Sequence, residues 1–533
     1  MICTKIIILC VLIGCATSYN ILGVFPYEGK SHFMLFEPYL REIAARGHNL
    51  TVISHFPQKI PIENYHDISL AGKSEVLESV FPIKRSYWSI IQISLFLVNF
   101  GTDNCRVMLE DTNVQNLWKS EAKFDVVITE QFQSDCGLGL AYKLGAPVVS
   151  ITSHLLMPWH YDRYGFHYNP SFMSYMFLEG GTKPTLYQRI ERTIFEYYMK
   201  FLYKHFSQAV DQKTLSKHVG DVPPLEELAQ DVKILLLYQH FVSSGTNILP
   251  GKIKEVAGFH VVKPKELHKD LKKFIDESKH GVIYVSFGSM LKASTTPKDK
   301  LEALIAVLSE LPQRVVMKWD ENTLPGNPKN IFVSNWLPQN DILAHPNVIA
   351  FMSHCGCLGT TEAMHHGVPI LGMPVFGDQP GNAAMIEESG LGVQIQVAEL
   401  SKELLLKKFN TILDPAFRAK VKELSKAWLD RPLSAMDTAI FWTEFVARNK
   451  NLTLRPSALD TPYYQYYNLD VLLFFITSLI GLLFIVVNCL IISLFLRTYM
   501  LLAFPCDFVR VEVENGPRNR VVPYKLCPPF SPP

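Results

Sequence analysis

The densest group of side chains that could do chemistry lies at residues 336–379. This segment reads WLPQNDILAHPNVIAFMSHCGCLGTTEAMHHGVPILGMPVFGDQ. An apolar run leads into a glycine-rich turn, a helical stretch follows, and a second apolar run ends in a Gly-Asp-Gln loop. Free N–H groups at a helix start, together with the positive end of the helix dipole, favour a phosphate. His354 could donate a further hydrogen bond, so the segment predicts a site for a diphosphate with a sugar beyond it.

Other side chains near this turn suit the remaining parts of such a ligand. Glu362 could accept hydrogen bonds from a ribose diol, as carboxylates do in other nucleotide sites. Asp378 and Gln379 follow the next expected strand and could hold sugar hydroxyls, while Trp336 could stack on a flat base whose edge Gln339 could bond.

A phosphate contact could also come from Ser289, which lies in a Phe-Gly-Ser turn after an expected strand at 281–287. Each of these residues alone is a weak signal, because a glycine-rich turn or a single histidine is more often structural. The ordered set is specific: Trp336, Gln339, His354, Gly356, Glu362, Asp378 and Gln379.

A candidate general base, His32, lies in the first part of the chain, where it follows Gly-Lys-Ser. It falls at the start of an expected helix, just past a strand end, and so faces a cleft. A helix N-terminus disfavours imidazolium, which helps to keep the ring neutral and able to accept a proton.

Two α/β halves are expected to position these residues. In the first half we predict strands at 21–25, 49–54, 125–129 and 146–151, with a helix at 32–45 that Gly47 ends. The first strand-helix-strand unit has a right-handed crossover, which implies a parallel sheet. In the second half we predict strands at 281–287, 314–319, 330–334, 348–353 and 369–373. Two doubly wound domains that face each other bind ligands at the carboxyl ends of their strands.

The expected boundaries follow from these patterns. An N-terminal acceptor-binding domain covers 19–250, a Pro-, Gly- and Lys-rich linker covers 251–280, and a C-terminal donor-binding domain covers 281–455. Residues 155–206 are rich in aromatic residues, Met and His, as is the patch at 87–100. Such a region could line an apolar ligand pocket, rest on a membrane surface, or form ordinary core helices.

Both ends of the chain carry membrane-related signals. Residues 1–18 read as a secretory signal, with Lys5, an apolar stretch and small residues before the cleavage point. Residues 471–496 form an uncharged block of 26 residues, long enough to span a bilayer, after a tyrosine-rich juxtamembrane segment at 456–470. The tail at 497–533 has five basic residues against three acids. The positive-inside rule then predicts a type I protein with a cytosolic tail and a lumenal main part.

Composition excludes some classes. Lys and Arg total 51 and Asp and Glu total 50, so nothing indicates nucleic acid as a partner. The lumenal part keeps Cys105, Cys136, Cys355 and Cys357, too few for a disulfide scaffold, and the last two lack the spacing of a zinc site. Two glycosylation sequons begin at Asn49 and Asn451, and Asn451 is the better candidate because the first opens an expected buried strand.

The ordered set at 336–379 resembles the signature of the UDP-glycosyltransferases, the family of membrane-bound UDP-glucuronosyltransferases and insect UDP-glucosyltransferases. PYEGKSHFMLFEPYLREIAARGH near the N-terminus and DRPLSAMDTAIFWTEFVARN at 430–449 extend the likeness over nearly the whole chain, in an invertebrate, insect style. The resemblance implies a GT-B fold, no metal or other cofactor, and inversion at the anomeric carbon. It implies that Trp336 and Gln339 contact the base and ribose of the donor, and that Ser289, His354 and Gly356 contact its diphosphate. It also implies that Glu362 binds the ribose, and that Asp378 and Gln379 bind the sugar.

The resemblance also implies that His32 is the catalytic base. A catalytic histidine usually needs a carboxylate to orient it, and alignment with the family points to the acid that follows the strand at 125–129. This chain offers Glu130, which aligns better, and Asp135, which has the shorter side chain of vertebrate members; we favour Glu130. One departure is Leu358, where many members have a polar residue that could contact the donor.

The expected function is thus transfer of a hexosyl group from a UDP-sugar to a small lipophilic acceptor at the endoplasmic reticulum membrane, as in detoxification or in hormone or pigment conjugation. UDP-glucose suits the insect style, and UDP-glucuronate stays open as the donor. A lipid- or protein-directed glycosyltransferase and a non-catalytic lipophile-binding protein are the alternatives. The acceptor and the oligomeric state, including a homo-oligomer, stay open.

Overall fold

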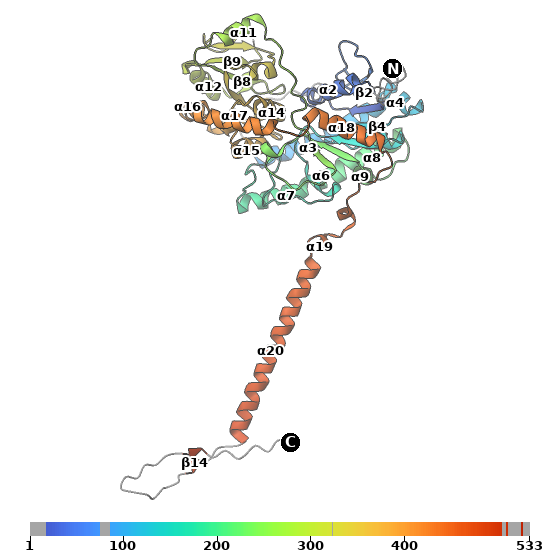
Figure 1. The fold of residues 1–533 in the computed structure, drawn as a ribbon, viewed down its shortest axis with the longest axis vertical. Coiled ribbons are helices and arrows are strands. Elements are labelled where there is room, and N and C mark those ends of the chain that lie inside the picture. Colours follow the sequence, from blue (N-terminus) through green and yellow to red (C-terminus); the bar gives the residue numbers. More distant parts are fainter. Residues whose placement is uncertain (1–17, 75–85, 322, 504–507, 510–523, 526–533) are drawn as a thin grey trace, which may run out of the picture. The chain divides into compact units, whose positions relative to one another are not determined.

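The computed structural model describes residues 18–74, 86–321, 323–503, 508–509 and 524–525, and it divides into the units Met1–Leu459 and Asp460–Pro533 (Figure 1). Almost all of the expected signal at 1–18 lies outside the described residues, as does most of the tail beyond residue 503. The larger unit holds both α/β halves.

The first half is built on a seven-stranded sheet in which every described pair of neighbouring strands is parallel. Its strand order is β3-β2-β1-β4-β5-β6-β7. The four strands predicted here are confirmed, and three more complete the sheet. The bounds are β1 (Asn20–Phe25), β2 (Asn49–Ser54), β3 (Tyr65–Ser69), β4 (Val126–Glu130), β5 (Val148–Ile151), β6 (Ile234–Leu237) and β7 (Ile253–Glu255).

The second half is a six-stranded parallel sheet in the order β10-β9-β8-β11-β12-β13. All five predicted strands are present, and β13, whose three residues are Gly, Val and Gln, was not predicted. The bounds are β8 (Val282–Ser286), β9 (Arg314–Lys318), β10 (Ile331–Ser334), β11 (Val348–Ser353), β12 (Ile370–Gly372) and β13 (Gly392–Gln394).

Helices connect the strands in both halves. In the first half they are α2 (Lys30–Ala45), α3 (Tyr87–Glu110), α4 (Thr112–Lys119), α5 (Cys136–Lys143), α6 (Pro158–Arg163), α7 (Leu186–Leu202) with the π-helical turn Tyr203–Gln208, α8 (Ala209–His218), α9 (Leu225–Gln230) and α10 (Phe241–Ser244). In the second half and after it they are α11 (Lys269–Asp276), α12 (Lys298–Glu310), α13 (Gln339–Leu343), α14 (Cys357–His366), α15 (Gln379–Ser389), α16 (Lys402–Leu413), α17 (Pro415–Leu429) and α18 (Ala435–Arg448).

The domain boundaries differ from those expected in two places. Strand β7 lies inside the expected linker at 251–280, where it pairs with β6 and extends the first sheet. Helix α18 lies inside the expected second domain but contacts α2 and β6 of the first half (Figure 1). Its Thr443 bonds to Tyr39 of α2, with 2.5 Å between the two hydroxyl oxygens. The chain therefore crosses between the halves twice.

The aromatic region at 155–206 is mostly core. Its rings, among them Trp159, Tyr161 and Tyr175, are buried in one hydrophobic cluster that also includes Leu235 of β6. The outer face of α7 stays exposed and is largely apolar, with Leu186, Tyr187, Ile190, Ile194, Tyr197 and Phe201 each more than half exposed.

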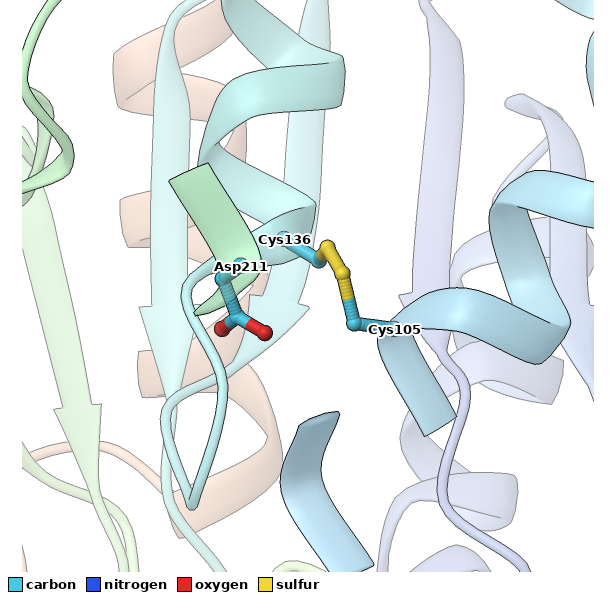
Figure 2. A group of neighbouring side chains, drawn as sticks. All are labelled: Cys105, Cys136 and Asp211. Carbon is cyan, nitrogen blue, oxygen red and sulfur yellow. A yellow bond between two sulfur atoms is a disulfide. The ribbon is translucent and has the colours of Figure 1, made fainter. Parts of the chain in front are cut away.

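A disulfide, which sequence analysis did not anticipate, joins Cys105 of α3 to Cys136 at the start of α5 (Figure 2). The Cα atoms are 5.6 Å apart, and the buried Asp211 carboxylate of α8 lies beside the two sulfurs. Sulfurs that are bonded to each other cannot act as thiolate ligands, so this cluster is not a metal site in its oxidised form. Among the described residues, Cys355 and Cys357 are free cysteines.

The smaller unit contains α19 (Tyr463–Tyr466), the long helix α20 (Leu469–Ala503) and the short strands β14 (Phe508–Val509) and β15 (Tyr524–Lys525). Helix α20 has 35 residues and a mean hydropathy of 2.9 in its most apolar stretch, long and apolar enough to cross a membrane. It includes the span expected at 471–496.

Candidate active site

Each sheet has one position at which the order of its strands reverses, and the candidate residues collect at these two positions. In the first sheet the reversal lies between β1 and β4, and in the second between β8 and β11. Open parallel sheets bind ligands in the crevice outside the carboxyl ends of the strands at such a point. His32 follows β1 and Glu130 ends β4, while Ser289 follows β8 and His354 follows β11. We call these two places the base crevice and the donor crevice.

In the base crevice, His32 and Glu130 form a short hydrogen bond. His32 lies in the first turn of α2, and its Nδ1 is 2.6 Å from Oε1 of Glu130. Ser153 also donates to Oε1 of Glu130 at 2.7 Å and lies 3.0 Å from Nδ1 of His32. The carboxylate accepts from Nδ1, and the lone pair of Nε2 is then free to take a proton.

The electrostatics of His32 differ from the sequence-based expectation. Burial lowers the pKa of His32, but the charge and hydrogen bond of Glu130, with a further contribution from Asp378, raise it above its ordinary value. The helix N-terminus was expected to keep the ring neutral, yet a nearby carboxylate outweighs that effect because it lies in direct contact with the ring. The pair is therefore built to stabilise an imidazolium once the ring has taken a proton.

Asp135, the other acid considered as the partner of His32, lies in a different network. Its two carboxylate oxygens accept from the guanidinium of Arg163 at 3.0 and 2.6 Å, and one of them also accepts from Gln208 at 3.0 Å. Arg163 bonds to Glu226 as well, at 3.0 Å. Asp135 and Arg163 are both 1% exposed, so Asp135 serves a buried ion pair, and Glu130 is the acid beside His32.

In the donor crevice, His354 lies between two glycines. A Cβ atom added to Gly288 or to Gly356 would come within 2.5 or 2.6 Å of Nε2 of His354, so both positions need glycine. Burial and the charge of Lys318 lower the pKa of His354 to about 4, which keeps the ring neutral. Within the described part of the chain its Nδ1 is buried and has no hydrogen-bond partner.

Helix α14 begins at Cys357, and Gly356 takes the N-cap position. No side chain caps this N-terminus, so its N–H groups are available to an anion. Thr360 in the first turn has a buried hydroxyl that finds no partner among the described residues. Leu358, the departure from the family pattern, packs against the hydrophobic core of the first half, so a polar contact is replaced by contact between the domains.

The residues expected around the ribose and the base are brought together. Gln339, the first residue of α13, donates to Oε2 of Glu362 at 2.5 Å. Burial raises the pKa of Glu362 to about 7. The ring of Trp336 is half exposed, and the ammonium groups of Lys30 and Lys318 lie 4.1 and 5.3 Å from its centre. Lys30 starts α2, so Trp336 faces the first domain.

The two residues expected to hold the sugar open α15. Asp378 is its N-cap and accepts from Asn382 at 2.6 Å, and burial raises the pKa of Asp378. The Gln379 side-chain carbonyl accepts from the backbone N–H groups of Val375 and Phe376 at 2.8 and 3.0 Å. Its oxygen therefore shapes the loop, and its amide nitrogen is left for a ligand. Ser289 is exposed in the turn after β8.

The two crevices belong to one cleft. The charge of Asp378 in the second domain contributes to the raised pKa of His32 in the first, which indicates that the two groups lie near each other. Gly381 of α15 lies so close to the backbone at Tyr175 and Met176 that an added Cβ would come within 2.7 Å of a carbonyl oxygen. Helix α15 thus connects the sugar residues to the aromatic region.

Sequence analysis missed three residues at these crevices. Ser153 lies two residues beyond β5, Lys318 ends β9, and Asn382 bonds to Asp378. The first two share one signal, a polar residue at the carboxyl end of a buried strand next to a point of reversal. The third has no sequence signal, because Asn382 is an interior residue of a helix whose packing only the fold determines.

These features define a class. Two parallel sheets, with a histidine–carboxylate pair in one crevice and a glycine-lined helix start in the other, have the GT-B architecture. Solved structures of that class share the fold. A calicheamicin glycosyltransferase, CalG4, matches with a TM-score of 0.56 and 17% identity, over 81% of this chain and 99% of that one. A UDP-glucose: anthocyanidin 3-O-glucosyltransferase in complex with UDP matches with a TM-score of 0.52 and 16% identity, over 81% and 99%.

Sequence relatives identify the family. The model of the UDP-glucoronosyl and UDP-glucosyl transferase family matches residues 20–499, and the chain belongs to that family. A UDP-glycosyltransferase, UGT5, from Dactylopius coccus is 35% identical, over 89% of this chain and 92% of its own length. UDP-glucuronosyltransferase 2B19 from Macaca fascicularis is 29% identical, over 91% and 96%. The protein is a glycosyltransferase that uses UDP-sugars.

Proposed function

We propose that this enzyme transfers a hexosyl group, glucose in the first instance, from a UDP-sugar to a hydroxyl of a small lipophilic acceptor, with inversion at the anomeric carbon. The observation that carries the proposal is the His32–Glu130 pair in the base crevice, in which Nδ1 of His32 lies 2.6 Å from Oε1 of Glu130. A second observation joins it to the donor: Asp378, a candidate sugar-binding residue, is close enough to raise the pKa of His32.

The mechanism follows from the roles that these groups can fill. Nε2 of His32 takes the proton of the acceptor hydroxyl, and Glu130 stabilises the imidazolium that forms. The acceptor oxygen forms a bond to the anomeric carbon while the bond to the UDP oxygen breaks on the opposite face, through an oxocarbenium-like transition state. Negative charge grows on the leaving diphosphate, where the start of α14 and the neutral His354 can donate hydrogen bonds.

The donor is proposed to be UDP-glucose. A relative from Dactylopius coccus that is named UDP-glucosyltransferase 2 is 34% identical over 89% of this chain, which supports glucose. Macaque relatives at 28–29% identity are named as glucuronosyltransferases, so UDP-glucuronate is the alternative donor.

The reaction is proposed to need no metal ion or other cofactor. The diphosphate has other positive partners available, namely the free N–H groups of α14 and the ammonium groups of Lys30 and Lys318 near Trp336. Helix N-termini bind phosphates without a cation. Rates that are unchanged after treatment with EDTA would agree with this, and a rate restored by added Mg²⁺ would contradict it.

A small lipophilic acceptor is supported by the apolar side chains around a small internal cavity of the first half, whose volume of about 20 Å³ would have to widen to admit a ligand. The cavity is lined mainly by apolar side chains, including Leu155, Leu156, Tyr161, Met173 and Met385. Leu155 comes two residues after Ser153 in the sequence. Conjugation of xenobiotics, hormones or pigments is the physiological role that fits such an acceptor.

The cellular place is proposed to be the endoplasmic reticulum membrane, with α20 as a single type I anchor and the catalytic unit in the lumen. The Cys105–Cys136 disulfide suits an oxidising compartment. The exposed apolar face of α7 suits contact with the lipid interface. Asn451 is exposed in the turn after α18 and is the preferred glycosylation site, whereas the side chain of Asn49 bonds to Asn20 at 3.0 Å.

The proposal is tested with microsomes that carry the protein, incubated with labelled UDP-glucose or UDP-glucuronate and a panel of phenols. Transfer from UDP-glucose is expected. Transfer from neither donor, with intact UDP binding, would favour a non-catalytic lipophile-binding protein. Transfer only to endogenous lipid or protein would favour a glycosyltransferase directed at those acceptors.

A further inference from the structure

Ser153 lies directly behind the proposed base and its carboxylate. Its hydroxyl donates to Oε1 of Glu130 at 2.7 Å, the same oxygen that lies 2.6 Å from Nδ1 of His32. The serine oxygen is 3.0 Å from Nδ1, so the three polar atoms form a closed triangle. Ser153 is 6% exposed and Glu130 is 3% exposed, which shields the triangle from bulk water.

The fold holds Ser153 in this place. Ile151 of β5 is the partner of Glu130 of β4 in the parallel register, so the segments that follow these two residues leave the sheet side by side. The backbone N–H of Thr152 donates to Leu236 of β6 at 3.0 Å, and its hydroxyl accepts from the N–H of Tyr238 at 3.0 Å. The backbone just before Ser153 is therefore held by β4 on one side and by β6 and Tyr238 on the other.

We propose that Ser153 is a positioning residue for the base: its hydroxyl donates to Glu130 and so fixes the carboxylate oxygen opposite Nδ1 of His32. The proposal rests on the proposed function for the role of His32, and on the triangle itself for the role of Ser153. A buried carboxylate without this donor would keep its charge and its contact with Nδ1, but its direction would be less tightly fixed, and the ring would be oriented less well for proton transfer. Orientation of a catalytic group by a neighbour is worth a measurable part of its rate.

Four titratable groups lie around the His32 ring, two acids and two neutral rings. Glu130 on β4 and Asp378 on α15 raise the pKa of His32. Tyr27, 6.5 Å away between ring centres, has a pKa raised well above its ordinary value by burial and stays neutral. His154, 6.4 Å away, has a pKa lowered to about 4 by burial and stays neutral too.

Loss of the Ser153 hydroxyl should therefore raise the pKa of His32. The Glu130 carboxylate would keep its charge but lose one donor, and it would attract the proton on the histidine more strongly. The imidazolium would then persist to higher pH. The pH at which His32 becomes a competent base would rise, and the rate at neutral pH would fall.

The test compares Ser153→Ala and Ser153→Thr in the full-length protein in microsomes, with Ser150→Ala as a matched control. Ser150 is a buried serine of β5, three residues before Ser153, and its side chain affects the pKa of Tyr164. For Ser153→Ala we expect kcat to fall about tenfold, since a hydrogen bond to a charged group is lost. The acid limb of kcat/KM should move to higher pH, and KM for the UDP-sugar should stay within about twofold. The Ser153→Thr variant should restore both kcat and the pH position of the acid limb of kcat/KM.

A second readout does not depend on turnover. Diethyl pyrocarbonate modifies neutral imidazole, and peptide mass spectrometry can follow His32 alone, whose side chain is 24% exposed. Half-maximal reactivity should move to higher pH in Ser153→Ala but not in Ser150→Ala. An unmoved reactivity profile, or a lower rate with an unmoved acid limb and no rescue by threonine, would overturn the proposal. A wild-type protein without transferase activity would overturn the proposed function instead, while the modification profile would still decide the role of Ser153.

Discussion

The two crevices are assembled in opposite ways. In the base crevice the polar groups that act on the proton satisfy one another, because His32, Glu130 and Ser153 bond to one another within 3.0 Å. In the donor crevice, among the described residues, buried polar atoms of His354 and Thr360 have no partner. Proton transfer requires a group whose pKa and direction are set before the substrate arrives. A diphosphate brings its own acceptors, so its site can leave donors unpaired until it binds.

This difference predicts different kinetic effects. A change in the base crevice should lower kcat, because it removes an interaction made in the transition state. A change in the donor crevice should mainly weaken binding of UDP and of the UDP-sugar. The substitutions below test that division, beginning with the largest expected effect.

His32→Ala removes the proposed base. Turnover should fall about 10²- to 10⁴-fold, the usual contribution of general-base catalysis. UDP binding, measured by calorimetry on purified protein in detergent, should stay within about twofold of wild type. A variant with a near-normal rate would show that another group accepts the proton.

Asp135→Asn distinguishes between Asp135 and Glu130, the two acids considered as the partner of His32. Asp135 is held by Arg163 in a buried ion pair, so removing its charge should cost about 3–5 kcal/mol of unfolding free energy. The melting temperature should drop, while the pH profile of the remaining folded enzyme should match wild type. A shifted profile would instead tie Asp135 to the base.

Glu130→Gln keeps the shape of the carboxylate and removes its charge. Turnover should fall about 10- to 100-fold, because a hydrogen bond between charged groups is worth about 1.5–3 kcal/mol. Glu130 raises the pKa of His32, so its loss should lower that pKa and move the acid limb of kcat/KM to lower pH. This shift is opposite in sign to that expected for Ser153→Ala, and the two pH profiles measured side by side check both assignments.

Glu362→Gln tests the donor crevice. Because burial raises the pKa of Glu362 to about 7, the carboxylate that would accept from the ribose is partly protonated near neutral pH. Wild-type affinity for UDP should therefore weaken about tenfold between pH 8 and pH 6, on the assumption that only the ionised form binds. The glutamine variant should bind more weakly at pH 8 and show little change with pH. A wild-type affinity that did not depend on pH would argue against a ribose contact.

Much of this architecture can be predicted from the sequence. Long apolar runs such as 348–353 are strong signals, and the glycine-rich turn behind them located the donor crevice. Four strands escaped prediction, namely β3, β6, β7 and β13; β7 and β13 have three residues each and mix polar with apolar side chains, whereas the equally short β12 lies in an apolar run. Helix α18 shows amphipathic character but not which domain it packs against, since only tertiary contacts decide that.

The same limit applies to the candidate site. His32 and Glu130 could be proposed from their places at a helix start and a strand end. Ser153 could not, because its role depends on β5 lying beside β4 in one register. The choice between Glu130 and Asp135 needed the structure, where the partner of Asp135 is Arg163 on α6.

The most direct test of the central claim is the anomeric configuration of the product formed from UDP-glucose, whose glucose is α-linked, determined by proton NMR. A single displacement by an acceptor that His32 deprotonates predicts a β-glucoside in every turnover. An α-glucoside would require two displacements or attack on the same face as the leaving UDP, and it would contradict the assignment of His32 as the base that activates the acceptor.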